Sequence, residues 1–101
     1  MLCGANSYEE KYYLDPDFSQ LPVEVKNELQ AACVLFAEDA GGIITIEFDK
    51  AGDIKVNISS DERDYLYDEI EAELCVRKLL DEKEELFGKL SLYYKIKNKL
   101  L

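Results

Sequence analysis

A chain of 101 residues with 48% hydrophobic and 34% charged side chains has the balance of one folded domain, so residues 1–101 are taken as one unit and not as a disordered segment. The formal net charge of −10 argues against general nucleic-acid or anionic-membrane binding, because both functions need a basic surface. No apolar run approaches the roughly 18 residues that span a bilayer, and no secretory signal is visible, so we expect a cytoplasmic protein.

The first 20 residues are expected to form an ordered arm that aromatic side chains hold against the domain. KYYL (11–14) has the composition of a short strand, and DPD (15–17) is a turn signal because proline fixes φ and aspartate bonds nearby backbone. Cys3 is interpreted as a small buried or edge residue, and Gly4 as a turn.

A helix is predicted over residues 22–40. Pro22 suits the first helical position, where a missing N–H costs nothing. Apolar residues recur at three- and four-residue steps and define one buried face. These residues are Val25, Leu29, Ala32, Cys33, Phe36 and Ala40. The pair Gly41-Gly42 is expected to end the helix, since glycine adopts the left-handed geometry of a C-cap without steric cost.

Residues 43–59 are predicted to form an antiparallel hairpin. IITIEF (43–48) and DIKVNIS (53–59) alternate in polarity, and the linking turn places Gly52 in the left-handed region. If Asp49 pairs with Asp53, the Ile, Val and Phe side chains share one face and Glu47 faces Lys55 on the other. Because a lone hairpin is marginal in water, its apolar face must pack on helices or join another subunit's sheet.

Residues 60–101 are predicted to form a long helix that is either continuous or broken. SSDE (59–62) has the pattern of a capping box, and no proline follows it. One continuous helix would measure about 60 Å, whereas a compact domain of this size has a radius of gyration of about 13 Å. The helix therefore either breaks, within DEKEELFG (81–88), or projects and needs another surface to cover it. The expected fold class is α+β.

Two apolar stripes are expected on this helical region. The first has the spacing of a heptad seam, with Lys83 and Lys97 interrupting it, and is the candidate interface with a second subunit. It consists of Val76, Leu79, Leu86, Leu90, Tyr93 and Leu100. The second stripe, Leu66, Ile70 and Leu74, is assigned to packing against the chain's own hairpin.

Charge is unevenly distributed along the chain. Residues 1–85 hold all 22 acidic and eight basic side chains, a charge of −14, whereas residues 86–101 hold four lysines and no acid, a charge of +4. This gradient complements the helix dipole. It also makes a surface that is complementary to itself when two copies pack antiparallel, so we predict a homodimer.

The sequence has no histidine, which removes the commonest general base, the Ser-His-Asp and Cys-His catalytic arrangements and the imidazole metal ligands. Cys3, Cys33 and Cys75 are far apart and form no CxxC pair, so neither a disulfide framework nor a zinc site is indicated. A catalytic N-terminal cysteine is not expected either, because Leu2 lies between Met1 and Cys3. We expect no enzymatic activity, no catalytic residue, no cofactor and no metal site.

The leading functional prediction is a non-enzymatic protein–protein interaction module that pairs with itself through the C-terminal helix and presents an acidic surface to a protein partner. The alternative is a domain that binds a small ligand or cation near the N-terminal arm. Its candidate residues are Tyr12, Tyr13, Asp15 and Asp17. The two aspartates resemble the start of an EF-hand loop, but Gln20 and Lys26 stand where glycine and glutamate are needed.

Three segments carry a resemblance to a known family: LCGANSYEEKYYL at the start, IITIEFD in the predicted hairpin and DYLYDEI after it. Together they resemble a small family of proteins of unknown function from clostridial and related bacteria, and the similarity covers nearly the whole chain. The resemblance implies a bacterial cytoplasmic protein. It implies nothing about activity, and it carries over no site residue.

Overall fold

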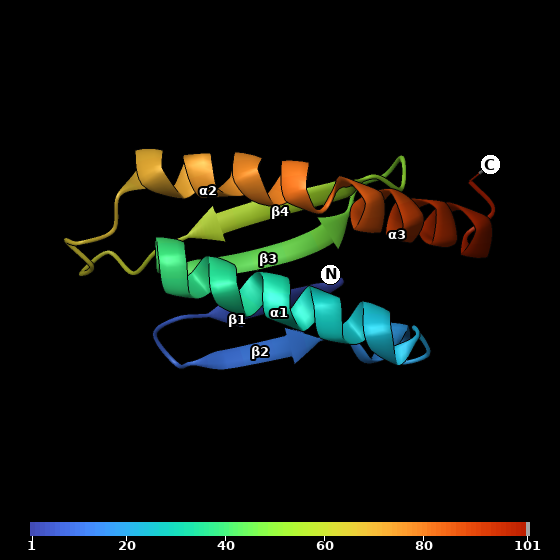
Figure 1. Ribbon diagram of the computed structural model, residues 1–101, viewed down its shortest axis with the longest axis horizontal. Helices are drawn as coiled ribbons and strands as arrows, with labels where there is room; N and C mark the ends of the chain where they lie inside the picture. The colour runs from blue at the N-terminus through green and yellow to red at the C-terminus, as the bar shows by residue number, and fades with distance from the viewer. Residues whose placement is uncertain (101) are drawn as a thin grey trace.

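The computed structural model describes residues 1–100, which form an α+β fold with three α-helices and one four-stranded antiparallel sheet (Figure 1). The sheet has the strand order β2-β1-β3-β4. The elements are β1 (Cys3–Asn6), β2 (Lys11–Leu14), the short 3-10 helix η1 (Pro16–Phe18), α1 (Val23–Ala40), β3 (Ile43–Phe48), β4 (Ile54–Ser59), α2 (Glu69–Glu82) and α3 (Glu84–Lys97).

The predicted central helix and hairpin are confirmed. Helix α1 begins one residue after Pro22 and ends at Gly41, whose φ of 73° only glycine adopts readily. Strands β3 and β4 pair in the predicted register, with Phe48 opposite Ile54 and Glu47 opposite Lys55. The register is determined locally because a shift by one residue would turn every apolar side chain of the hairpin toward water.

The N-terminal arm is more regular than predicted. The strand at 11–14 is confirmed as β2, but residues 3–6 form a second strand, β1, that lies between β2 and β3. The prediction of a turn at Gly4 is wrong. Gly4 lies within β1, where a Cβ atom would stand 2.8 Å from the carbonyl oxygen of Ile44. The glycine therefore lets two central strands approach closely, a role that weak strand propensity hides in the sequence.

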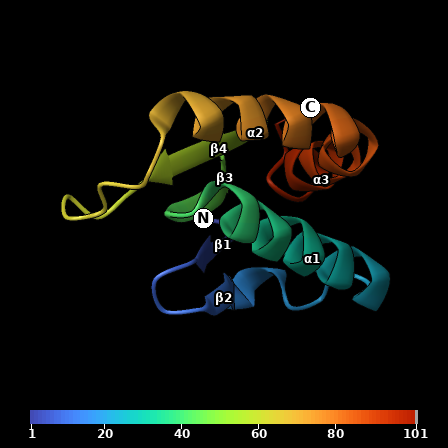
Figure 2. The same cartoon turned by 60° about the vertical axis from the view of Figure 1, so that its left-hand side comes forward.

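The C-terminal region contains two helices, and its first helix begins later than predicted. The capping box at 59–62 is not used. Asp68 is the N-cap of α2 and accepts hydrogen bonds from the amides of Ile70 and Glu71. The helix then breaks at Lys83, inside the predicted window 81–88, and α3 continues in a new direction (Figure 2). Residue 101, the end of the predicted range, lies outside the described residues.

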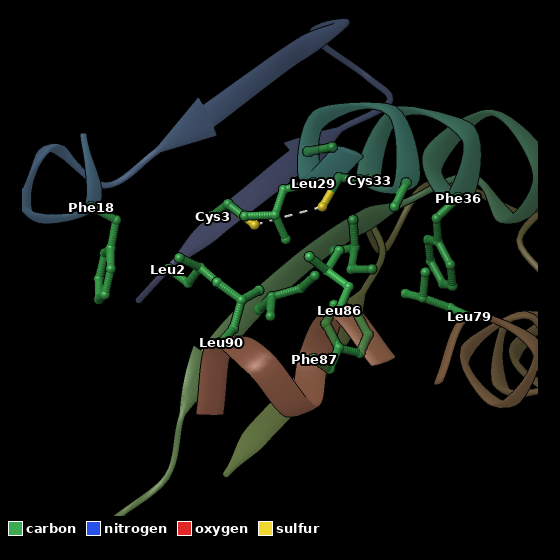
Figure 3. Packing of buried hydrophobic residues seen from close by; sticks show 14 of the residues in the cluster. Leu2, Cys3, Phe18, Leu29, Cys33, Phe36, Leu79, Leu86, Phe87 and Leu90 are labelled. Atoms are coloured by element: carbon green, nitrogen blue, oxygen red, sulfur yellow. Dashed lines mark hydrogen bonds between the residues drawn. The ribbon is translucent and has the colours of Figure 1, made fainter. Parts of the chain in front are cut away.

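All three α-helices pack on one face of the sheet. The core joins Cys3 and Ala5 of β1 and Ile44 and Ile46 of β3 to apolar side chains of the helices (Figure 3). The helical contribution is Leu29, Ala32, Cys33, Phe36 and Ala37 from α1, Leu79 from α2, and Leu86, Phe87 and Leu90 from α3. The opposite face of the sheet carries the alternate residues, such as half-exposed Tyr13, and no helix among residues 1–100 packs on it.

Candidate functional site

The predicted interface residues lie against the core of their own chain. Leu79, Leu86 and Leu90 are buried in it, and Val76 and Tyr93 pack against it half-buried. Leu100 alone is exposed. The break at Lys83 allows the seam on both helices to face the sheet, so five of the six side chains are already covered without a second subunit.

The second stripe also lies elsewhere than predicted. Ile70 and Leu74 are exposed, Ile70 to 76%, and do not pack on the hairpin. On α2, Ile70 stands on the side opposite buried Ala72, since two residues further along a helix nearly reverses the direction of a side chain. Leu74 borders the hollow between α1 and α2, which Leu35 and Leu79 also line. The spacing of the apolar residues could have indicated that one of the two stripes stays exposed, because two stripes on different sides of one helix cannot both face one sheet.

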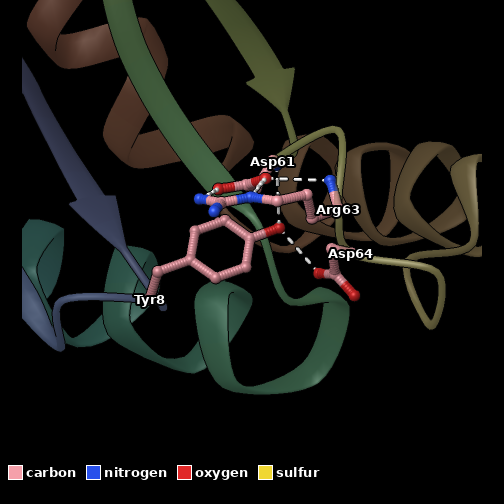
Figure 4. Close-up of polar contacts among 4 residues, drawn as sticks. All are labelled: Tyr8, Asp61, Arg63 and Asp64. Carbon is pink, nitrogen blue, oxygen red and sulfur yellow. Dashed lines mark hydrogen bonds and ion pairs between the residues drawn. The ribbon is translucent and has the colours of Figure 1, made fainter.

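The segment between β4 and α2 projects from one end of the molecule (Figures 1 and 2). It is fixed by Tyr8 (Figure 4), whose hydroxyl donates to Asp64 Oδ2 at 2.6 Å and accepts from the Asp61 amide at 3.1 Å. The bond to Asp64 raises the pKa of Tyr8. Arg63 lies within 3.2 Å of the Asp61 carboxylate and lowers the pKa of that group. These contacts order a segment that has no regular secondary structure.

This ordered segment presents two apolar side chains to solvent. Tyr65 is 92% exposed and Leu66 is 95% exposed. With Ile70 and Leu74 they form what we term the α2 patch. Most of the charged side chains near it are acidic, namely Asp68, Glu69, Glu71 and Glu73, all of them exposed, and the exposed basic side chains Arg63 and Arg77 lie close to it in the chain. Large exposed apolar patches on soluble proteins mark interaction sites.

A second exposed apolar group lies at the other end of the molecule. Leu92 and Ile96 point away from the core side of α3, and Leu100 follows the helix end. We term these three residues the α3 patch. Lysines lie around it: Lys89, Lys95, Lys97 and Lys99. Lys95 Nζ is engaged at 2.8 Å by Asp53, and it lowers the pKa of that carboxyl.

The four candidate ligand residues of the arm do not form one site. Tyr12 and Tyr13 are neighbours in β2 and point to opposite faces of the sheet, as strand geometry requires. Asp15 caps η1 by accepting from the amide of Asp17 at 3.0 Å. The two aspartates line a hollow of about 370 Å³ together with Lys97 of α3, which neither tyrosine reaches.

The Cys3 and Cys33 side chains meet in the core, with their sulfur atoms 3.7 Å apart (Figure 3). The hydroxyl of Tyr12 lies close to both thiols. The contact with Cys3, followed by burial, raises the pKa of Cys33. Burial raises the pKa of Tyr12, whose hydroxyl has no hydrogen-bond partner among residues 1–100. The contact between the two thiols lowers the pKa of Cys3. Both thiols are fully buried in the core, where cysteine packs as a small apolar residue.

Within the described part of the chain, no three Cys, Asp or Glu side chains converge in a way that could hold a metal ion. Over the same residues, no helix combines the length and apolar character that crossing a membrane requires. The features that stand out are therefore the two apolar patches with opposite charge around them.

Comparison with known proteins places the chain in a family. Residues 1–99 match the family described as "Family of unknown function (DUF6145)", and the chain belongs to that family. The resemblance found in the sequence is thus confirmed at the level of a family of unknown function. No curated protein matches the chain, and no solved structure matches it.

Proposed function

We propose that this member of the DUF6145 family is a non-enzymatic protein–protein interaction module that associates with itself through its C-terminal helices. The proposal differs from the sequence prediction in the residues that carry it. The heptad seam is occupied by the core, so the association uses the outward sides of α2 and α3.

One observation carries the proposal: the α2 patch is held in place while its apolar side chains stay in water. Tyr8 orders the segment before α2 through two hydrogen bonds, and Tyr67 packs against Gly42, where an added Cβ would stand 2.7 Å from its ring. Leu66 nevertheless remains 95% exposed. Ordering a segment before binding lowers the entropy lost on association, which favours a docking role.

The direct test is the solution mass across about two orders of magnitude in protein concentration, measured by light scattering or sedimentation. The intact chain is expected to move from monomer to dimer. The double variant Ile70→Ser and Leu74→Ser is expected to stay monomeric, because it removes the two helical apolar side chains of the α2 patch. Truncation before α3 is not a useful test, since it would remove Leu86, Phe87 and Leu90 from the core.

Val23→Ser is the matched control. Val23 is exposed and apolar like Ile70, but it lies at the start of α1, outside both patches. Its mass curve should coincide with that of the unaltered chain. A chain that is monomeric throughout, or an equal effect of both variants, would refute self-association through the C-terminal helices.

The hollow beside the arm supports a second candidate, binding of a small ligand or cation. Asp15 and Asp17 line it together with Phe48 and Tyr94, whose rings stack at 4.1 Å. Its volume of about 370 Å³ lies at the lower end of the range for ligand sites. Thermal unfolding with Ca²⁺, Mg²⁺ or a panel of free amino acids tests it. A rise in Tm that Asp17→Asn abolishes would support this site, and no rise with any probe would reject it for these ligands.

A further inference from the structure

The α2 patch and the α3 patch lie at opposite ends of a molecule that extends 43 Å along its longest axis (Figure 1). We infer that the occupant of each patch is the other patch on a second copy of the chain. The α2 patch of one copy packs on the α3 patch of its partner, and the reverse contact forms at the same time. This inference rests on the proposed function and adds to it the pairing of the two surfaces.

The position of the helices makes this pairing geometrically simple. Helices α2 and α3 follow one another along the long axis and are joined at Lys83 (Figure 1). A two-fold axis perpendicular to the long axis and near Lys83 exchanges the two ends. It therefore brings both α2 patches onto α3 patches in one closed dimer, so no patch is left to bind a third copy.

The apolar side chains of the two patches have matching spacing. Ile70 and Leu74 are four residues apart on α2, and Leu92 and Ile96 are four residues apart on α3. Residues at this spacing form ridges along a helix, and ridges of one helix pack into grooves of another. Tyr65 and Leu66 lie beyond the start of α2, so they reach toward the end of the partner's α3, where Leu100 is exposed.

Charge decides between this pairing and the two like-with-like alternatives. Two α2 patches in contact would bring together the acidic side chains around each, and two α3 patches would do the same with lysines. Like charges in contact are unfavourable, whereas the crossed arrangement puts Glu71 and Glu73 near Lys89 and Lys99 of the partner. Exposed pairs add little energy, so charge selects the orientation and the apolar side chains supply the affinity.

The junction between the helices limits the affinity of this dimer. Asp81 and Glu84 are exposed there, close to the two-fold axis, where each meets its own copy. Lys78 and Arg77 are also exposed at this point and offset part of the repulsion. We therefore expect a weak, reversible dimer and not a permanent one.

A charge-reversal experiment tests the pairing. The first variant carries Lys89→Glu and Lys99→Glu, so the acidic side chains of a partner's α2 patch meet two glutamates in place of two lysines. The second variant carries Glu71→Lys and Glu73→Lys, so the lysines of a partner's α3 patch meet two lysines in place of two glutamates. All four positions are exposed, and circular dichroism with thermal unfolding checks that each variant is folded.

Each variant alone is expected to be monomeric at concentrations where the unaltered chain is dimeric. An equimolar mixture is expected to regain the dimer mass, about twofold that of either variant alone, because the substituted side chains then meet side chains of opposite charge in both crossed contacts. Self-association of the first variant alone would point to contact between two α2 patches, or to another surface, and would overturn the inference. A mixture that stays monomeric would overturn it as well.

These failures can be told apart from failure of the proposed function. If the unaltered chain dimerises but the variants do not behave as expected, only the pairing of α2 with α3 is wrong. If the unaltered chain is monomeric at every concentration, both proposals are wrong.

Discussion

Two leucines that are two residues apart on α3 should respond very differently to replacement by alanine. Leu90 is 2% exposed and belongs to the core, whereas Leu92 is 51% exposed and faces away from it. Both substitutions remove the same atoms from the same helix, and both gain the same small improvement in helix propensity. The difference between them therefore measures burial alone.

The expected magnitudes follow from that burial. Leu90→Ala loses the transfer free energy of a fully buried side chain and leaves a cavity, which together lower the free energy of unfolding by about 2.7–5 kcal/mol. Full burial of a leucine contributes about 1.5–3 kcal/mol, and Leu92 is only half covered and leaves no enclosed cavity, so Leu92→Ala should lose about 1 kcal/mol or less. The marginal stability of a small domain makes the first loss severe.

Urea denaturation of both variants measures this difference. The protein concentration must be low enough for the unaltered chain to be monomeric, so that the proposed association does not add to the stability. A change in midpoint at constant slope reports stability alone. Equal losses for Leu90 and Leu92 would refute the assignment of the heptad seam to the core, as would a Leu90→Ala variant that alters the solution mass but not the monomer's stability.

Four further predictions concern a glycine inside a helix, a glycine in a turn, a helix cap and an ion pair. Gly88→Ala should raise the free energy of unfolding by about 0.5–1 kcal/mol, because Gly88 lies inside α3 with open space around it. Gly52→Ala should lower the free energy of unfolding by about 1–2 kcal/mol, because Gly52 has a φ of 88°. If urea denaturation showed Gly52→Ala to be more stable than Gly88→Ala, the backbone conformations of these two glycines would be wrong. Asp68→Ala should lower the free energy of unfolding by about 1 kcal/mol, because α2 loses its N-cap. An unchanged Tm would indicate that the helix begins at an earlier residue. Lys95 lowers the pKa of Asp53 in the folded chain, so the ionised carboxylate stabilises the fold above its ordinary pKa, and this stabilisation is lost as the pH falls below about 4. The free energy of unfolding of Asp53→Asn should therefore fall less than that of the unaltered chain between neutral and acidic pH. Parallel curves of stability against pH would show that the ion pair contributes nothing.

The hairpin was predictable in detail because its determinants are local. Alternation over 43–48 and 53–59 and a glycine in the turn leave one register that buries the apolar side chains. The helix over 22–40 was predictable for the same reason, since its periodicity and the glycines after it are close in sequence. A break of the C-terminal helix was predicted within residues 81–88 because one continuous helix would be too long for a compact domain. The helix breaks at Lys83, inside that range.

The site was predicted less well, because the sequence offers two stripes on the C-terminal helices and no means of ranking them. The spacing of Leu79, Leu86 and Leu90 suits a subunit interface as well as it suits a core. Ile70 and Leu74 have the same helical spacing and were assigned to the core, but they are exposed. Which stripe faces inward depends on where α2 begins, and the Asp68 cap was missed because the pattern at 59–62 is the more familiar signal.

Composition and local pattern by themselves determined the fold class, the central helix, the hairpin register and the charge gradient, since each depends on residues that are near one another in the chain. The tertiary structure decided the rest. It inserted β1 between β2 and β3, where Gly4 permits close approach, and it turned the heptad seam toward the sheet. It also fixed the segment of Tyr65 and Leu66 through Tyr8, a residue more than 50 positions away. Contacts over such distances follow from how the apolar faces of separate elements cover one another, and no single stretch of the sequence contains that information.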